Sequence, residues 1–171
     1  MLCVTSYVAM LRAVNVSGTG KLPMAELKAM GEACGFTNVR TFIASGNLLF
    51  ESDLSEAAVA QSVAEKVDAY FGKPVPLFLR SAAEMKAVEE DNPFAGQPGN
   101  RVVAHFMANA PTQAMIDAAT GQKDDQLALG KREIYIFYGD GMGTSKLKLP
   151  ALREGTARNM NSVAKIAELL A

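Results

Sequence analysis

Two short polar segments near the start of the chain carry the side chains best suited to chemistry. Their guanidinium, ammonium, amide and hydroxyl groups are hydrogen-bond donors of the kind that bind carboxylates and phosphates. The glycines among them allow a ligand to approach the backbone closely. These residue types predict a binding site for a small anionic ligand, such as a phosphate ester or a nucleotide. The predicted ligand-binding residues in these segments are Arg12, Asn15, Gly18, Lys21, Ser45 and Asn47.

Two further candidates, Arg158 and Asn159, precede the last expected helix of the chain. The side chain of Asn159 is suited to capping that helix, an interaction worth about 1 kcal/mol. A cation at the start of a helix opposes the helix dipole. We therefore expect Arg158 to serve an acidic side chain or a bound anion, and both residues join the predicted ligand-binding set.

The segment from Asn15 to Lys21 resembles a phosphate-binding P-loop, but it departs from that pattern at both ends. The pattern G-x-x-x-x-G-K-[ST] requires glycine where Asn15 stands, and a Mg²⁺-binding hydroxyl where Leu22 stands. Nucleotide hydrolysis is therefore not expected. His105 is the single histidine, and the two cysteines, Cys3 and Cys34, are far apart. No metal, no cofactor and no catalytic residue is predicted.

Composition favours an ordinary globular protein with no general affinity for polyanions. The 171 residues carry a net charge of -1, whereas nucleic-acid binding needs a basic surplus. No apolar run reaches the roughly 18 residues of a membrane span, so no membrane association is expected. Two distant cysteines and the absence of a basic leader favour a cytoplasmic protein.

The elements that must position these side chains form an α+β pattern. Residues 1–90 read as strand, helix, two strands, helix, strand and helix, which is a ferredoxin-like half followed by one more helix. Ser81 and Glu84 form a capping box for that last helix. Residues 91–100, rich in proline and glycine, are expected to be a linker. Residues 101–171 repeat the pattern in a degenerate form, ending in a helix but without a clear final strand, so two ferredoxin-like halves packed together are predicted.

Strand geometry explains why the two polar segments should meet. The first two strands of a ferredoxin-like half run in the same direction, so both end at the same edge of the sheet. The loop 12–22 follows the first strand and the turn 45–47 follows the second. We therefore expect Arg12, Asn15 and Lys21 to lie near Ser45 and Asn47.

Several stretches resemble a known bacterial family, and the resemblance extends from Tyr7 to Leu170. The family is catalogued as domain of unknown function 1697. It implies cytoplasmic α+β proteins of two related halves, without an assigned activity or catalytic residues. Members commonly carry an Arg-Asn-Trp-Asn motif near the end, where this chain has Met160 in place of the tryptophan. The stretches that carry the resemblance are Tyr7–Val16, Leu22–Leu27, Gly35–Thr41, Ser45–Asn47 and Thr156–Asn161.

Three alternatives to anion binding remain open. An enzyme of unknown reaction would need an acid or base that the sequence does not place. An exposed edge strand in either half would allow a homo-oligomer to form. A nucleic-acid-binding module would present aromatic side chains on its sheet for base stacking. The aromatic residues on expected strands are Phe42, Phe50, Phe106, Tyr135 and Phe137.

Overall fold

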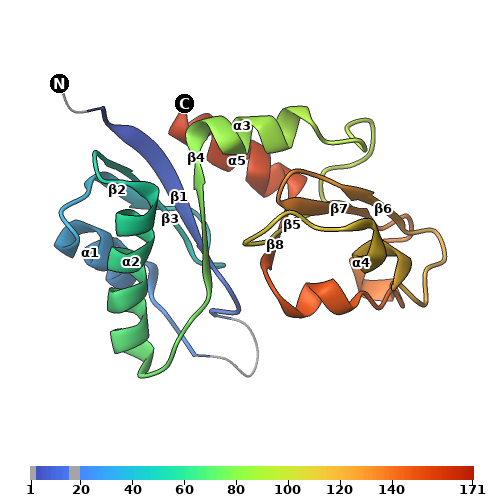
Figure 1. Ribbon diagram of the computed structural model, residues 1–171, viewed down its shortest axis with the longest axis horizontal. Helices are drawn as coiled ribbons and strands as arrows, with labels where there is room; N and C mark the ends of the chain where they lie inside the picture. The colour runs from blue at the N-terminus through green and yellow to red at the C-terminus, as the bar shows by residue number, and fades with distance from the viewer. Residues whose placement is uncertain (1–2, 16–19) are drawn as a thin grey trace. The chain divides into compact units, whose positions relative to one another are not determined.

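The computed structural model describes residues 3–15 and 20–171. The chain divides into two compact units, which we call the first unit (residues 1–84 with 168–171) and the second unit (residues 85–167). Each unit contains one four-stranded antiparallel sheet (Figure 1). The α+β class with two ferredoxin-like halves is thereby confirmed. Whether residues 91–100 act as a linker stays a prediction.

The first unit has the strand order β2-β3-β1-β4, in which every neighbouring pair is antiparallel. Since β1 and β2 are both antiparallel to β3, they run in the same direction, as the sequence predicted. Its elements are β1 (Thr5–Leu11), α1 (Met24–Ala33), β2 (Thr37–Thr41), β3 (Asn47–Ser52), α2 (Glu56–Phe71) and β4 (Leu77–Ser81).

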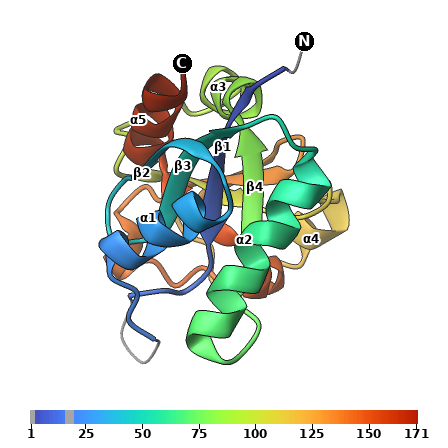
Figure 2. The same cartoon turned by 90° about the vertical axis from the view of Figure 1, so that its left-hand side faces the viewer.

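Two helices cover one face of this sheet, and the core of the first unit lies beneath them (Figure 2). Apolar residues recur every three or four positions along α2, so Val59, Val63 and Val67 share its buried side. They pack against strand residues such as Leu48 and Phe50, which have no exposed surface.

Local signals set the ends of α2. The hydroxyl of Ser55 accepts a hydrogen bond from the backbone N–H of Ala58 at 3.2 Å, so Ser55 caps the first turn. Gly72 ends the helix with a left-handed φ of 68°, a conformation that glycine adopts without strain. The expected capping box of the next helix is also present, with Glu84 N–H 3.2 Å from the hydroxyl of Ser81.

The second unit has the strand order β6-β7-β5-β8, which is the same arrangement. The expectation that this half lacks a clear final strand is wrong, because residues 156–159 form β8 and pair with β5. The half is degenerate in another way, since two short 3-10 turns stand where the first unit has α2. Its elements are α3 (Ala82–Glu90), β5 (Val102–Phe106), α4 (Gln113–Asp117), β6 (Gln126–Leu129), β7 (Glu133–Phe137), the 3-10 turns Met142–Thr144 and Pro150–Arg153, β8 (Thr156–Asn159) and α5 (Met160–Leu170).

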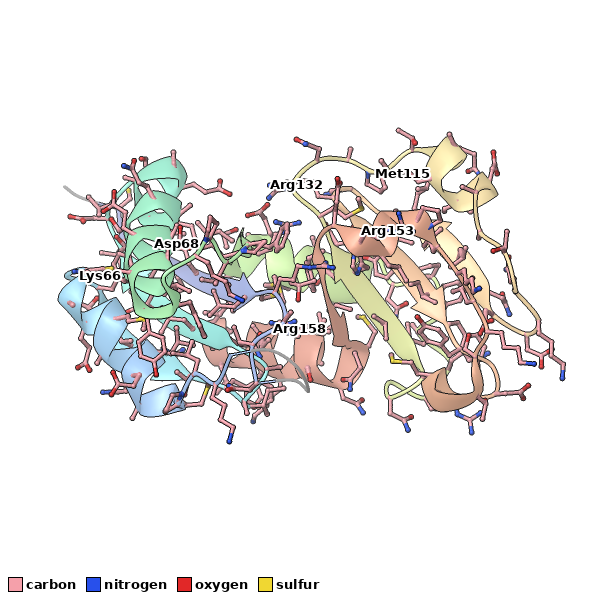
Figure 3. The ribbon with its side chains drawn as sticks, turned by 90° about the horizontal axis from the view of Figure 1, so that it is seen from below. Lys66, Asp68, Met115, Arg132, Arg153 and Arg158 are labelled. Carbon is pink, nitrogen blue, oxygen red and sulfur yellow. The ribbon has the colours of Figure 1, made fainter. Side chains whose placement is uncertain are left out.

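The second sheet has its own apolar core. Met115 of α4, marked in Figure 3, packs with Ile134 and Ile136 of β7 on one face. On the other face, the hydroxyl of Tyr135 donates to the carbonyl of Val88 in α3 at 2.9 Å. Across the described ranges, every helix is too short or too polar to span a lipid bilayer.

Candidate functional site

The loop after β1 and the turn after β2 meet at one edge of the first sheet, as expected. The side-chain amide of Asn15 donates to the carbonyls of Leu22 and Ala44, both at 2.8 Å. Its oxygen accepts the backbone N–H of Leu22 at 2.6 Å. Asn15 adopts a left-handed φ of 57°, which asparagine tolerates better than most residues. The two bonds with Leu22 close the loop on itself, and the bond to Ala44 joins the loop to the segment before the turn.

The turn 45–47 is held by its own hydrogen bonds and contacts the loop after β1. Asn47 is fully buried, and its amide donates to the carbonyl of Phe42 at 2.9 Å and to the hydroxyl of Ser45 at 3.1 Å. Gly46 accepts the backbone N–H of Leu11 at 2.9 Å. A Cβ atom at Gly46 would lie 2.6 Å from a methyl of Val14, so only glycine fits this contact. Polar groups predicted to face a ligand thus stabilise the turn itself.

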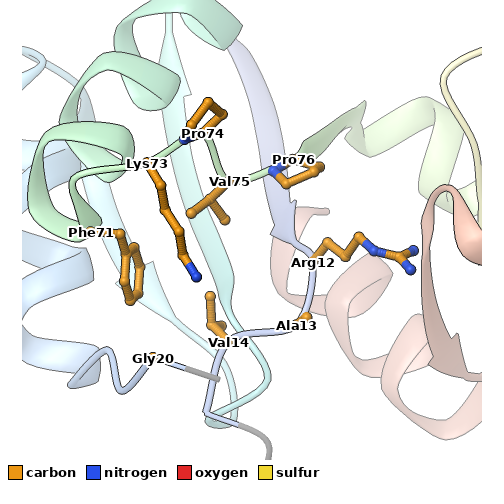
Figure 4. Close-up of a pocket in the computed structure, with 9 residues that line it drawn as sticks. All are labelled: Arg12, Ala13, Val14, Gly20, Phe71, Lys73, Pro74, Val75 and Pro76. Carbon is orange, nitrogen blue, oxygen red and sulfur yellow. The ribbon is translucent and has the colours of Figure 1, made fainter. Parts of the chain in front are cut away.

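A cavity of about 180 Å³ lies beside this edge, within the first unit (Figure 4). One wall comes from the loop after β1, and the other comes from the end of α2 and the connection to β4. The lining is mostly apolar, with two basic side chains. The lining residues are Arg12, Ala13, Val14, Gly20, Phe71, Lys73, Pro74, Val75 and Pro76.

Backbone hydrogen bonds hold the second wall in place. The carboxylate of Asp68 on α2 accepts the backbone N–H of Val75 at 2.9 Å. The backbone N–H of Arg12 donates to the carbonyl of Pro76 at 2.9 Å, which ties the two walls together. Pro74 and Pro76 have a fixed φ, so this wall loses little entropy when a ligand binds. The cavity is therefore formed before any ligand arrives.

The ring of Phe71 packs directly on the backbone of Gly20. A Cβ atom at Gly20 would lie 2.4 Å from the Cε1 atom of Phe71. Any larger residue would push the ring or the loop aside, and the shape of the cavity depends on both. Glycine at this position is therefore required by close approach rather than by backbone conformation.

The charge of the lining is positive. Lys73 runs alongside the ring of Phe71, and its ammonium group ends near Val14 (Figure 4). The guanidinium of Arg12 extends away from Phe71, so the stem of this side chain contributes more to the wall than its charge does. The described lining contains no carboxylate, and residues 16–19 of the loop are Val, Ser, Gly and Thr.

The predicted residues therefore divide into different places. Arg12 lines the cavity, whereas Lys21 is exposed and lies outside its lining. Gly18 lies outside the described residues. Sequence reasoning missed Phe71 and the segment 73–76. The signal available in the sequence was a lysine that stands between a helix-ending glycine, Gly72, and two prolines.

Arg158 and Asn159 lie in the second unit. Asn159 caps α5, because its side-chain oxygen accepts the backbone N–H of Ser162 at 2.9 Å. Arg158, marked in Figure 3, is buried on β8 and donates to the hydroxyl of Thr156 at 2.8 Å and to the carbonyl of Ala157 at 2.9 Å. Burial lowers the pKa of Arg158 to about 10, because the charged form loses its hydration.

The aromatic residues that lie on strands are unsuited to stacking on bases, and Phe42, which is partly exposed, follows the end of β2 instead of lying on a strand. Phe50 and Phe106 have no exposed surface, and the exposed fractions of Tyr135 and Phe137 are 2% and 9%. Phe50 stacks on Phe36 with ring centroids 4.1 Å apart, which is a core contact. These side chains fill the interior, so they lend no support to a nucleic-acid-binding module.

A second cavity, of about 230 Å³, lies in the second unit between residues 121–125 and 140–146. Asp125 accepts a hydrogen bond from the hydroxyl of Ser145 at 3.1 Å. The pKa of Asp124 is raised by a hydrogen bond with Asp140 and by the negative charge of that neighbour. Within the described ranges, no three His, Cys, Asp or Glu side chains gather as a metal-binding group.

Comparison with known proteins points to a single family. The family described as "Protein of unknown function (DUF1697)" matches residues 4–135. A solved structure, that of the conserved bacterial protein SP0830 from Streptococcus pneumoniae, is similar over 99% of this chain and 100% of that chain. Its TM-score is 0.82 and its sequence identity is 26%. No curated protein sequence matches the chain.

Proposed function

Since the chain belongs to the DUF1697 family, whose description assigns no activity, we propose from the first unit's cavity that the protein binds a small organic anion. The observation that carries this proposal is the lining itself. It is a preformed pocket of about 180 Å³ whose charged members are Arg12 and Lys73, both basic. Small-molecule sites are typically apolar concavities with a few well-placed polar groups.

Each residue of this edge then has a role. Lys73 supplies the charge that faces the ligand, and Arg12 adds positive potential from the opposite wall. Asn15 joins the loop to the segment before the turn through its bond to Ala44, and Ser45 and Asn47 stabilise the turn itself. Lys21 belongs to the same loop, and we propose that it borders the entrance, whereas Gly18 lies outside the described residues. In the second unit, Arg158 and Asn159 support β8 and α5 instead.

Binding without chemistry is favoured over catalysis. General acid–base catalysis needs a titratable group within hydrogen-bond reach of the reacting proton. The described lining offers Lys73 as a titratable group, but it offers no carboxylate, histidine or cysteine to act with it. We therefore propose a binding protein rather than an enzyme. A cytoplasmic location and a homo-oligomeric state stay predictions from the sequence.

Thermal denaturation of the full chain with a panel of carboxylates, sulfate and phosphate tests the proposal. A ligand present at 100 times its Kd stabilises the folded state by about 2.7 kcal/mol. We expect one class of anion to raise Tm in the natural protein and in Lys131→Met, a matched loss of an exposed lysine in the second unit. The same anion should have little effect on Lys73→Met. If no anion raises Tm, or if both variants respond alike, the proposal is wrong.

A further inference from the structure

We infer that the anion held in the first unit's cavity is a small carboxylate with an aromatic or branched apolar body, rather than a phosphate ester or nucleotide. This inference rests on the proposed function, because it names the ligand class of the same site. It follows from the size of the cavity, the chemistry of its walls and the hydrogen-bond donors that the walls leave available.

Size sets the first limit. The cavity measures about 180 Å³, which is below the roughly 300 Å³ at the lower end of sites for drug-sized ligands. A closed apolar cavity of about 150 Å³ is known to hold benzene. The space therefore suits a body of one six-membered ring or a short branched chain. A nucleotide carries a base, a sugar and a phosphate, and it would extend well beyond the walls.

The walls favour an apolar body. The ring of Phe71 and the side chains of Val14 and Val75 line the space, and Pro74 and Pro76 add further carbon surface. Such surface gains about 25 cal/mol for each Å² that a ligand removes from water. An aromatic ring placed against Phe71 gains further from offset stacking. A phosphate or a bare sugar would leave this surface without a partner.

Several backbone donors of the described walls are already used within the protein, which disfavours a phosphate. Phosphate sites in proteins use several backbone N–H groups at once, often at a glycine-rich loop or helix start. Here the backbone N–H groups of Arg12 and Val75 already donate within the protein. Pro74 and Pro76 have no N–H to offer. Two more donors of the loop are used within it. The backbone N–H of Asn15 donates to the carbonyl of Gly20, and that of Leu22 donates to the side-chain oxygen of Asn15.

A single ammonium matches a single carboxylate. Lys73 ends its side chain within the cavity beside Phe71 (Figure 4). A monoanion with its carboxylate at this ammonium and its ring along Phe71 satisfies the charge and covers the apolar wall together. A phosphate dianion would bring a second charge to the one ammonium that Figure 4 shows beside Phe71, and desolvation of that extra charge has a cost.

Isothermal titration calorimetry of the full chain with benzoate, acetate, inorganic phosphate and adenosine monophosphate tests the inference. Benzoate should bind at least tenfold more tightly than each of the other three. Acetate separates the contribution of the ring from that of the carboxylate. Lys73→Met, which keeps the length of the side chain, should weaken benzoate binding about tenfold, since a hydrogen bond to a charged group is lost. Lys131→Met should leave it unchanged.

The outcomes separate this inference from the proposal on which it rests. If phosphate or adenosine monophosphate binds more tightly than benzoate and depends on Lys73, the site binds anions but the carboxylate class is wrong. If benzoate binds to Lys73→Met as tightly as to the natural protein, the lysine does not bind the carboxylate and the inference fails. If none of the four anions binds, the inference is overturned, and the broader anion panel decides the proposed function.

Discussion

The two units share one strand order but close over their sheets by different means. In the first unit, α1 and α2, with 10 and 16 residues, cover a face of the sheet. In the second unit, α4 has 5 residues and the later crossover contains 3-10 turns instead of a helix. The comparison teaches that strand pairing preserves a ferredoxin-like sheet even where a crossover helix is lost.

A buried arginine is common to both units. Arg80 on β4 lies opposite Val8 of β1, and Arg158 on β8 lies opposite Ala104 of β5. Each side chain donates from Nη1 to the carbonyl of the preceding residue, at 3.0 Å in Arg80 and 2.9 Å in Arg158. The fourth strand of each sheet therefore carries a buried arginine with the same backbone hydrogen bond, although the sequences of the two halves show no clear repeat.

The cavities, by contrast, have opposite character. The cavity of the first unit is bounded by the end of α2 and is basic and apolar. The cavity of the second unit lies at a loop crossover and carries Asp124, Asp125 and Asp140 together with two lysines. The two cavities thus differ because the first is bounded by a helix end and two prolines, which make it rigid and mostly apolar, whereas the second is bounded by polar loops.

The largest loss of folding stability is expected from a substitution at Gly155, the residue before β8. Its φ is 85°, and a Cβ atom there would lie 2.2 Å from the carbonyl oxygen of Phe106. Gly155→Ala combines backbone strain with a clash against immovable backbone, so we expect about 4 kcal/mol of destabilisation. Gly20→Ala should cost about 1–2 kcal/mol, because Phe71 is a side chain that can shift. Urea denaturation measures both, with Gly96→Ala as control, since nothing lies within 4 Å there.

Equal costs at Gly155 and Gly20 would mean that the close approach at the second unit's final strand is relieved by backbone movement.

Helix cover should count for more in the first unit than in the second. Leu27 of α1 is fully buried, whereas Met115 of α4 is partly buried. Leu27→Ala should destabilise the first unit by about 3 kcal/mol, and Met115→Ala the second by about 1 kcal/mol. Hydrogen exchange of backbone amides in β1 and β7 reports each unit by itself. A greater loss of protection in Met115→Ala would contradict the view that the second sheet depends little on its short helix.

Replacement of Asn15 by alanine should cost about twice as much stability as replacement of Asn159. Asn15→Ala removes two hydrogen bonds to Leu22 within the loop and one to Ala44 across the two segments, and it places alanine at a left-handed φ, so we expect a loss of about 2 kcal/mol. Asn159→Ala removes one capping bond and should cost about 1 kcal/mol. Chemical denaturation with an unchanged m-value checks both. A neutral Asn15→Ala would show that the loop and the turn stay joined without it.

The smallest effect concerns the pKa of Asp124. Hydrogen bonding and repulsion from Asp140 hold this pKa above the usual 3.8. The folded value exceeds the unfolded one, so the associated stability is present below the unfolded pKa and is lost as pH rises through the folded pKa. Carbon-13 NMR titration should show the raised pKa, and Asp140→Ala should return it toward the usual value. An unchanged titration in Asp140→Ala would assign the shift to another cause.

Sequence patterns predicted the sheet well where apolar residues alternate or recur. The apolar stretch from Tyr7 to Leu11 and the three valines of α2 at positions 59, 63 and 67 all lie in the core. β8 was missed because Thr156-Ala157-Arg158-Asn159 contains a charged residue that turns inward. Binary patterning assigns a charge to solvent, so a buried arginine hides a strand from this reasoning.

The candidate site shows the same division. The meeting of the two loops followed from strand direction, and the hydrogen bond from Asn15 to Ala44 confirms it. The wall formed by Phe71 and residues 73–76 was not predicted, because it depends on where α2 ends in space relative to β1. Asn15 and Asn47 are of a residue type that often contacts ligands. Their hydrogen-bond partners here are groups of the protein itself, and the sequence alone does not reveal those partners.

The central claim is that the first unit's cavity takes an organic anion through Lys73, and one NMR titration tests it most directly. Backbone amide spectra of nitrogen-15-labelled full chain are recorded during addition of benzoate, for the natural protein and for Lys73→Met. The account predicts saturable shifts confined to residues 12–15, 20–22 and 71–76, and their loss in Lys73→Met. Shifts centred on the second unit, or no saturable shift at all, would contradict it.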